Sequence, residues 1–189
     1  QVYLSYFGAD NEQLNIFSWV LQIPNYLFQS LGTGLSSTVI PLYAALLARN
    51  QREEASRFGS NILCITSVGM VVLIGIGMAL SPLLPRLTDF SDKDYAAKAL
   101  MIMMPVMFFY GINYIFQGIL QSIGQFRLPA AVSIPSSLTV MLYVFLWGDR
   151  FGVTGLLIAT FIGLALQAII LIPPVLKAGY RFRFLLDFK

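Results

Sequence analysis

The chain has 189 residues, of which 57% are hydrophobic and only 11% charged. A soluble domain has about 25% charged residues, so this composition indicates an integral membrane protein. The chain has no His and one Cys, Cys64, which excludes His-based triads, His metal sites and internal disulfides. We therefore expect a membrane protein that is not an enzyme and has no metal site or cofactor, with Cys64 as a small apolar side chain inside a span.

Five stretches contain no Asp, Glu, Lys or Arg: 13–48, 58–85, 99–126, 128–148 and 151–176. A bilayer core of ~30 Å needs about 20 helical residues, and each stretch is at least that long. A charge at mid-membrane costs at least ~2.5 kcal/mol, which accounts for the absence of charges. Core helices of a soluble protein do not repeat at this length. The pattern predicts an all-α membrane protein.

The first stretch is too long for one straight crossing, because 36 residues at ~1.5 Å each reach about 54 Å. Gly32 and Gly34 interrupt it, and Pro24 and Pro41 each remove a backbone donor. We expect one bent helix over 13–48, since two separate spans would be too short.

The remaining elements follow from the charge-free stretches and the turn residues between them. Residues 1–8 are too short to cross alone, so we expect them to end an earlier helix and the sequence to be a fragment of a longer protein. The lobe over 1–176 is then predicted to contain, in order, this helix end at 1–8 and spans at 13–48, 59–83, 97–122, 129–148 and 152–175, followed by a juxtamembrane connector at 177–189.

The distribution of Lys and Arg predicts the orientation. With loop 49–57 in the cytoplasm, eight of the twelve basic residues lie on that side and four on the other. The connector 177–189 is then also cytoplasmic. Because the basic residues are dispersed over loops, we do not expect a nucleic-acid partner. The cytoplasmic set is Arg49, Arg52, Arg57, Arg127, Lys177, Arg181, Arg183 and Lys189.

Two polar stripes lie inside the predicted spans. The first repeats at intervals of three and four residues, which places its members on one helix face, and the second repeats every four residues. Lipid satisfies no hydrogen bond of an amide, so such faces must look into the helix bundle or into water. The simpler interpretation is contact between helices, at ~0.6 kcal/mol per amide. We interpret the stripes as the wall of a substrate cavity: Asn15, Ser18, Gln22, Asn25 and Gln29 in the first, and Asn113, Gln117 and Gln121 in the second.

Small residues predict close helix packing instead. Gly155, Ala159 and Gly163 recur every four residues on one helix face. The glycine-rich run at 32–37 has no strand before it and no Lys after it, so it does not fit a nucleotide-binding loop.

Three sequence blocks resemble the lipid II flippase family (MurJ/MviN) in their order and separation. The first contains Phe7-Gly8-Ala9, Ile23-Pro24-Asn25 and Val39-Ile40-Pro41. The second runs from Gln117 to Ala130 and resembles the link between the fourth and fifth helices of that family, and the third runs from Pro173 to Gly179 and resembles the end of the sixth. The resemblance covers nearly the whole chain.

This resemblance implies the six-helix N-terminal lobe of a two-lobe flippase in the multidrug, oligosaccharidyl-lipid and polysaccharide group, located in the bacterial inner membrane. It implies transport of a lipid-linked diphosphate glycan, the peptidoglycan precursor, to the outer leaflet. The implied partners are this substrate, membrane lipid and a C-terminal lobe. Where the family has an acid this chain has Asn15, and where it has basic residues this chain has Gln22, Phe28 and Gln29.

Two alternatives stay open at this point. The uncharged stripe also fits a related exporter of another lipid-linked glycan or of a drug. A lobe that has lost transport and serves as a membrane scaffold would have a dry, packed interface along Asn15–Gln29.

Overall fold

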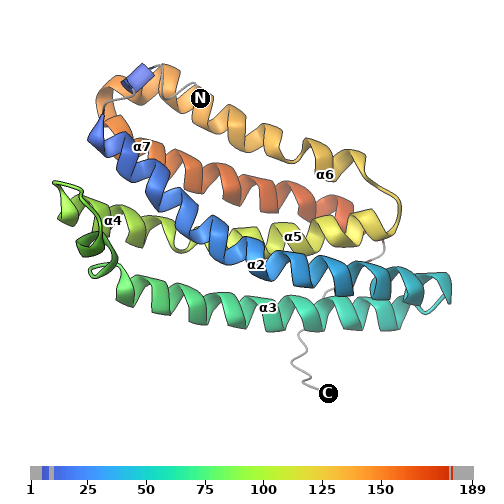
Figure 1. Cartoon of the computed structure of the whole chain (residues 1–189). Coiled ribbons are helices and arrows are strands. Elements are labelled where there is room, and N and C mark those ends of the chain that lie inside the picture. Colours follow the sequence, from blue (N-terminus) through green and yellow to red (C-terminus); the bar gives the residue numbers. More distant parts are fainter. Residues whose placement is uncertain (1–5, 9–10, 179, 181–189) are drawn as a thin grey trace.

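The computed structural model describes residues 6–8, 11–178 and Tyr180, without the side chains of 29–38. The described part is a bundle of long, nearly antiparallel helices (Figure 1). Three of its helical stretches are long and apolar enough to cross a membrane: Arg52–Leu80, Lys93–Ser122 and Arg127–Lys177. The fold is therefore that of an all-α membrane protein, as the composition predicted.

The first described helix, α2, runs over Glu12–Ala48 and passes through both internal prolines, Pro24 and Pro41. Its first turn is capped by Asn11, whose side-chain oxygen accepts the Gln13 backbone N–H at 3.0 Å. α2 packs against α5 (Val106–Ser122), α3 (Arg52–Leu80) and α4 (Lys93–Met103), and so lies centrally in the bundle (Figure 1). Only residues 6 and 7 of the predicted helix end at 1–8 are described as helical.

α3 begins seven residues before the predicted span at 59. Its first turn carries Glu53 and Glu54, and acidic side chains stabilise the N-terminal end of the helix dipole, so the helix extends beyond the apolar stretch. α3 ends at Leu80, just before Pro82, and a short 3₁₀ helix, η1 (Leu84–Leu87), leads to α4. The charge pattern marks the membrane-crossing part of a helix rather than its ends.

The predicted single span at 97–122 is two helices in series, α4 and α5. The break falls at Met104 and Pro105, where proline has no N–H for the helical ladder. Met103, Met104 and Met107 surround this break and are fully buried, within a core that also contains Leu14 and Phe17 of α2. Flexible methionine side chains fill the irregular space around the break.

The last two predicted spans form a helical hairpin. A short helix, α6 (Arg127–Ala131), leads into α7 (Ser133–Lys177), which contains a sharp interruption at Gly152 with φ 56° and ψ −147°. We call residues 133–151 the first arm and 153–177 the second arm; they run side by side in opposite directions (Figure 1). This backbone conformation is essentially restricted to glycine, so Gly152 lets the chain reverse without a longer loop.

Contacts between the two arms confirm that they are antiparallel neighbours. A Cβ at Gly163 would lie 3.0 Å from the Ser136 Cα, which shows how closely the arms approach. Gln167 Nε2 donates to Ser136 Oγ at 2.8 Å, and Tyr143 Oη donates to the Gly152 carbonyl at 2.6 Å. The predicted packing role of Gly163 is confirmed.

Candidate functional site

The polar stripe of α2 lies on the face of the helix that the described bundle leaves open. Asn15, Gln22 and Asn25 are exposed, and Ser18 is half-buried. Other positions of the helix carry the fully or almost fully buried side chains of Leu14, Ile16, Phe17 and Val20. The side chain of Gln29 lies outside the described residues.

Aromatic contacts fix how α2 is rotated about its axis. Trp19 packs edge-on against Phe90, with ring centroids 5.5 Å apart. Phe28 stacks on Tyr110 at 6.0 Å and meets Tyr114 edge-on at 5.5 Å. Because these rings hold α2 near its N-terminal end and in its middle, the amide-bearing face is directed away from the bundle core by packing.

The side chains of the second stripe, on α5, lie in different environments. Asn113 is buried, and its Nδ2 donates to the Leu164 carbonyl of the second arm at 3.4 Å. Its Oδ1 is buried without a hydrogen-bond partner among the described residues. Gln117 and Gln121 are half-buried. Asn113 therefore lies in a contact between helices, and the structure does not bring it together with the exposed amides of α2.

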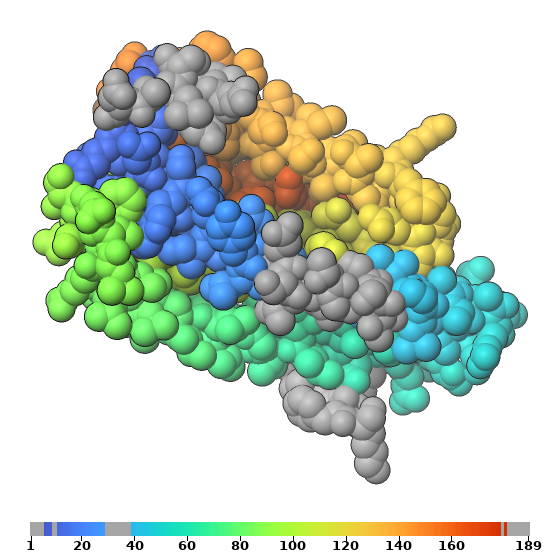
Figure 2. All heavy atoms as spheres, in the orientation of Figure 1, coloured from blue at the N-terminus to red at the C-terminus, as the bar shows by residue number. Residues whose placement is uncertain are grey.

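The surface next to α2 is recessed. Figure 2 shows a hollow between α2 and the first arm of the hairpin, with the second arm at its floor. No Asp, Glu, Lys or Arg lies in α2 between Glu12 and Arg49. The polar side chains of α2 between these two residues are therefore uncharged amides and hydroxyls, and the role of the stripes as a cavity wall stays a prediction.

The described residues contain no cluster of three or more His, Cys, Asp or Glu side chains that suits a metal ion. Cys64 is a free thiol, and it is buried, as its mid-span position predicted.

The end of α7 is held by a contact that sequence reasoning missed. Tyr180 is 3% exposed, and its hydroxyl lies 3.1 Å from that of Ser60 on α3. Its ring also packs close to Gly59 and to the ring of Tyr43. Burial raises the pKa of the Tyr180 phenol, while the Ser60 hydrogen bond opposes part of that rise. The rest of the predicted connector at 177–189 lies largely outside the described residues.

Comparisons with known proteins identify the family. The family described as lipid II flippase MurJ matches residues 4–189. A probable lipid II flippase MurJ of Borreliella burgdorferi is 26% identical over 187 residues, which is 97% of this chain and 37% of the relative. The lipid II flippase MurJ of Thermosipho africanus is 26% identical over 186 residues, 96% of this chain and 38% of the relative.

A third relative, a probable lipid II flippase MurJ of Synechocystis, is 28% identical over 147 residues, 75% of this chain and 27% of the relative. The chain therefore spans less than two-fifths of the length of these curated relatives. The family match covers nearly the whole chain, and the described fold is an all-helical membrane bundle. On this basis the chain belongs to the MurJ family of lipid II flippases.

Proposed function

We propose that this chain forms the first helical lobe of a flippase that moves lipid II from the cytoplasmic to the outer leaflet of the bacterial inner membrane. The names of the relatives and the family match over residues 4–189 support this activity. A second lobe, from the part of such proteins that this chain does not span, would face the first across a central cavity. Alternating access of that cavity to the two leaflets would carry the substrate.

The observation that carries the proposal is the unpacked polar face of α2. An amide that faces lipid leaves its hydrogen-bond donors and acceptors unsatisfied, so contact between this face and lipid hydrocarbon is energetically unfavourable. Asn15, Gln22 and Asn25 are nevertheless exposed on a helix that carries buried side chains at other positions. A polar cavity between two lobes gives these amides the partners that lipid lacks.

The chemistry of the stripe suggests which part of the substrate it contacts. Primary amides both donate and accept hydrogen bonds, which suits sugar hydroxyls and peptide groups. A diphosphate is bound best by Arg or Lys, and α2 has neither between Glu12 and Arg49. We therefore assign the α2 stripe to the glycan and peptide portion of the substrate rather than to its diphosphate.

The orientation that goes with this function places loop 49–57 and the end of α7 in the cytoplasm. The excess of Lys and Arg on that side supports it. The hairpin turn at Gly152 then lies at the outer surface. Cysteine accessibility tests this arrangement: a Cys at Asn50 should react with a membrane-impermeant reagent only in opened cells, and one at Arg150 in intact spheroplasts.

A related exporter of a different lipid-linked glycan is the second candidate function. The uncharged character of the α2 stripe favours it, because an uncharged wall does not select for a diphosphate. The two candidates differ in which lipid accumulates when the protein is lost.

Depletion of the full-length protein in its own host tests the proposed function. The leaflet that holds the lipid-linked peptidoglycan precursor is measured in a strain without a redundant flippase. We expect the precursor to accumulate in the cytoplasmic leaflet and to return to the outer leaflet when the wild-type gene is restored. An unchanged distribution of this precursor, with accumulation of another glycan lipid, would establish the second candidate.

A further inference from the structure

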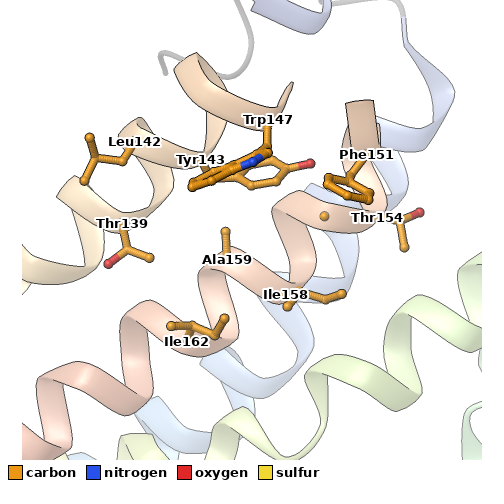
Figure 3. A pocket seen from close by; sticks show the side chains of 10 residues that line it. Thr139, Leu142, Tyr143, Trp147, Phe151, Thr154, Ile158, Ala159 and Ile162 are labelled. Atoms are coloured by element: carbon orange, nitrogen blue, oxygen red, sulfur yellow. The ribbon is translucent and has the colours of Figure 1, made fainter. Parts of the chain in front are cut away.

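A groove runs along the hairpin between the two arms of α7. It has a volume of about 590 Å³ and opens on the surface of the bundle. Its walls carry aromatic and branched aliphatic side chains that face one another across the gap (Figure 3). The lining residues include Leu142, Tyr143, Trp147, Phe151, Ile158 and Ile162.

Small residues create this groove. Gly155 and Ala159 form part of its lining on the second arm, opposite the larger side chains of the first arm. Tyr143 lies directly over Gly155, so a side chain at that position would overlap its phenol. Small side chains on one helix and a ring on the other thus leave room beside a close interhelical contact.

The side-chain hydroxyls that line the groove are already hydrogen-bonded within the protein. Thr139 Oγ1 donates to the Pro135 carbonyl at 2.8 Å, and Thr154 Oγ1 donates to the hydroxyl of Tyr95 at 3.3 Å. The Tyr143 hydroxyl donates to the Gly152 carbonyl. Water in the groove would therefore find few hydrogen-bond partners. An apolar chain in the groove would break no hydrogen bond.

The groove lies on the outside of the bundle. On the second arm, Ile158 and Ile162 are exposed, whereas Leu156 and Leu157 on other faces are completely buried. The groove is thus open to whatever surrounds the protein, which for these apolar spans is the bilayer.

A positive charge lies at the end of the groove near the hairpin turn. The Arg150 guanidinium carbon is 5.6 Å from the ring centroid of Phe151, a lining residue. The neighbouring Asp149 accepts a hydrogen bond from the Tyr6 hydroxyl at 2.7 Å. Trp147 is half exposed at the same end, where Trp and Arg typically meet lipid headgroups. An apolar groove with a cation at the end near the membrane surface fits a phospholipid. The acyl chain would lie in the groove and the phosphate would lie at the cation.

We propose that the hairpin groove binds one acyl chain of a phospholipid in the leaflet that meets the hairpin turn, with the lipid phosphate at Arg150. This inference does not depend on the proposed function, because the groove faces away from the core and its lipid would be a phospholipid of the membrane rather than a transported substrate. A bound lipid would fill the space beside Gly155 and hold the two arms at their observed separation.

Photo-crosslinking of the full-length protein tests the proposal. The probe is phosphatidylglycerol with a photoactivatable diazirine in one acyl chain, added at increasing mole fraction to detergent-solubilised protein, and labelled peptides are mapped by mass spectrometry. We expect labelling of residues 139–162 to saturate at low mole fraction and to be displaced by unlabelled phosphatidylglycerol. Labelling of Val71 and Val72, which are exposed on α3, should rise in proportion to the probe without saturating.

Two variants separate the groove from the charge. Ile158→Trp places a large ring in the groove from an exposed position and should abolish the saturable labelling. Arg150→Gln should raise the mole fraction needed for half-saturation about fivefold, the effect of one basic side chain near an anionic headgroup. Val72→Trp on α3 is the matched control and should change neither quantity.

Three results would overturn the proposal. The first is labelling of the hairpin that rises in proportion to the probe, as on α3. The second is saturable labelling that Ile158→Trp leaves unchanged. The third is a crosslink from a photoreactive amino acid at Leu142 to another protein segment rather than to lipid, which would show that protein covers the groove.

Discussion

The hydroxyls of Tyr180 and Ser60 lie 3.1 Å apart, although 120 residues separate them in the sequence. Ser60 is fully buried on α3, and Tyr180 follows the end of α7, so this pair connects the last described residue to α3. The ring of Tyr180 fits where Gly59 leaves room for it. The position of Tyr180 is therefore fixed by packing as well as by a hydrogen bond.

Tyr180→Phe should remove the hydrogen bond and keep the ring. We expect it to lower the free energy of unfolding by about 0.5–1.5 kcal/mol. Tyr180→Ala also removes the ring from its contacts with Gly59 and Tyr43 and should cost about 3–5 kcal/mol. Thermal unfolding of the full-length protein in detergent measures both effects. Equal losses for the two variants would show that packing of the ring contributes nothing.

The Tyr180 contact should also depend on pH. An unfolded Tyr has a pKa of about 10, and burial raises the pKa of Tyr180 in the folded protein. Folding therefore favours the neutral phenol, so the stabilisation is complete below pH 10 and is lost as the pH rises above 10 through the raised pKa. The difference in phenolate absorbance between wild type and Tyr180→Phe gives the titration of this one group. A difference curve with its midpoint at or below pH 10 would contradict the buried placement.

Gly163→Ala tests the close approach of the hairpin arms. The new Cβ would lie 3.0 Å from the Ser136 Cα, a backbone atom that cannot move without shifting the first arm. We expect a loss of about 1–3 kcal/mol, as for other overpacked contacts. Gly69→Ala is the matched control, because nothing lies within 4 Å of a Cβ there, and alanine favours a helix over glycine. Unfolding temperatures of the two variants should move in opposite directions.

Replacing Gln22 and Gln29 together by Leu tests the assignment of the α2 stripe. Gln22 is exposed on the polar face, so the folded protein should form with its normal unfolding temperature. Transport of the lipid-linked precursor should be abolished, because two amides of the proposed cavity wall are lost. Gln125→Leu, which changes an exposed amide in the connection between α5 and α6, should transport normally. Normal transport by the double variant would refute the cavity assignment.

The long helices could be predicted from the sequence because a charged side chain inside the bilayer has a high free-energy cost, which keeps charges out of the membrane spans. The absence of charges over 13–48 and the lack of a polar turn at Gly32–Gly34 together predicted a single long element, and α2 is continuous there. The same reasoning missed the break at Pro105, because the charge pattern does not change across it. A proline in the middle of an apolar stretch was the available signal.

The site was harder to anticipate because polarity alone does not say what a side chain faces. Asn113 and Asn15 have the same chemistry, yet one donates to the Leu164 carbonyl inside the bundle and the other is exposed. The difference arises from which helix lies alongside, and that depends on contacts between distant segments. The docking of Tyr180 and the hairpin groove depend on such contacts as well, and no local pattern marks them.

The break between α4 and α5 has a mechanical consequence for the lobe. Because Pro105 has no N–H, the backbone hydrogen bond that a continuous helix would form from this position is missing, and the methionines around it have flexible side chains. α4 contacts η1, α2 and the hairpin, while α5 forms the larger contact with α3. This crossing thus has one point of low resistance to bending, and a change of angle there would shift its contacts with α2 and the hairpin, which pack against both α4 and α5.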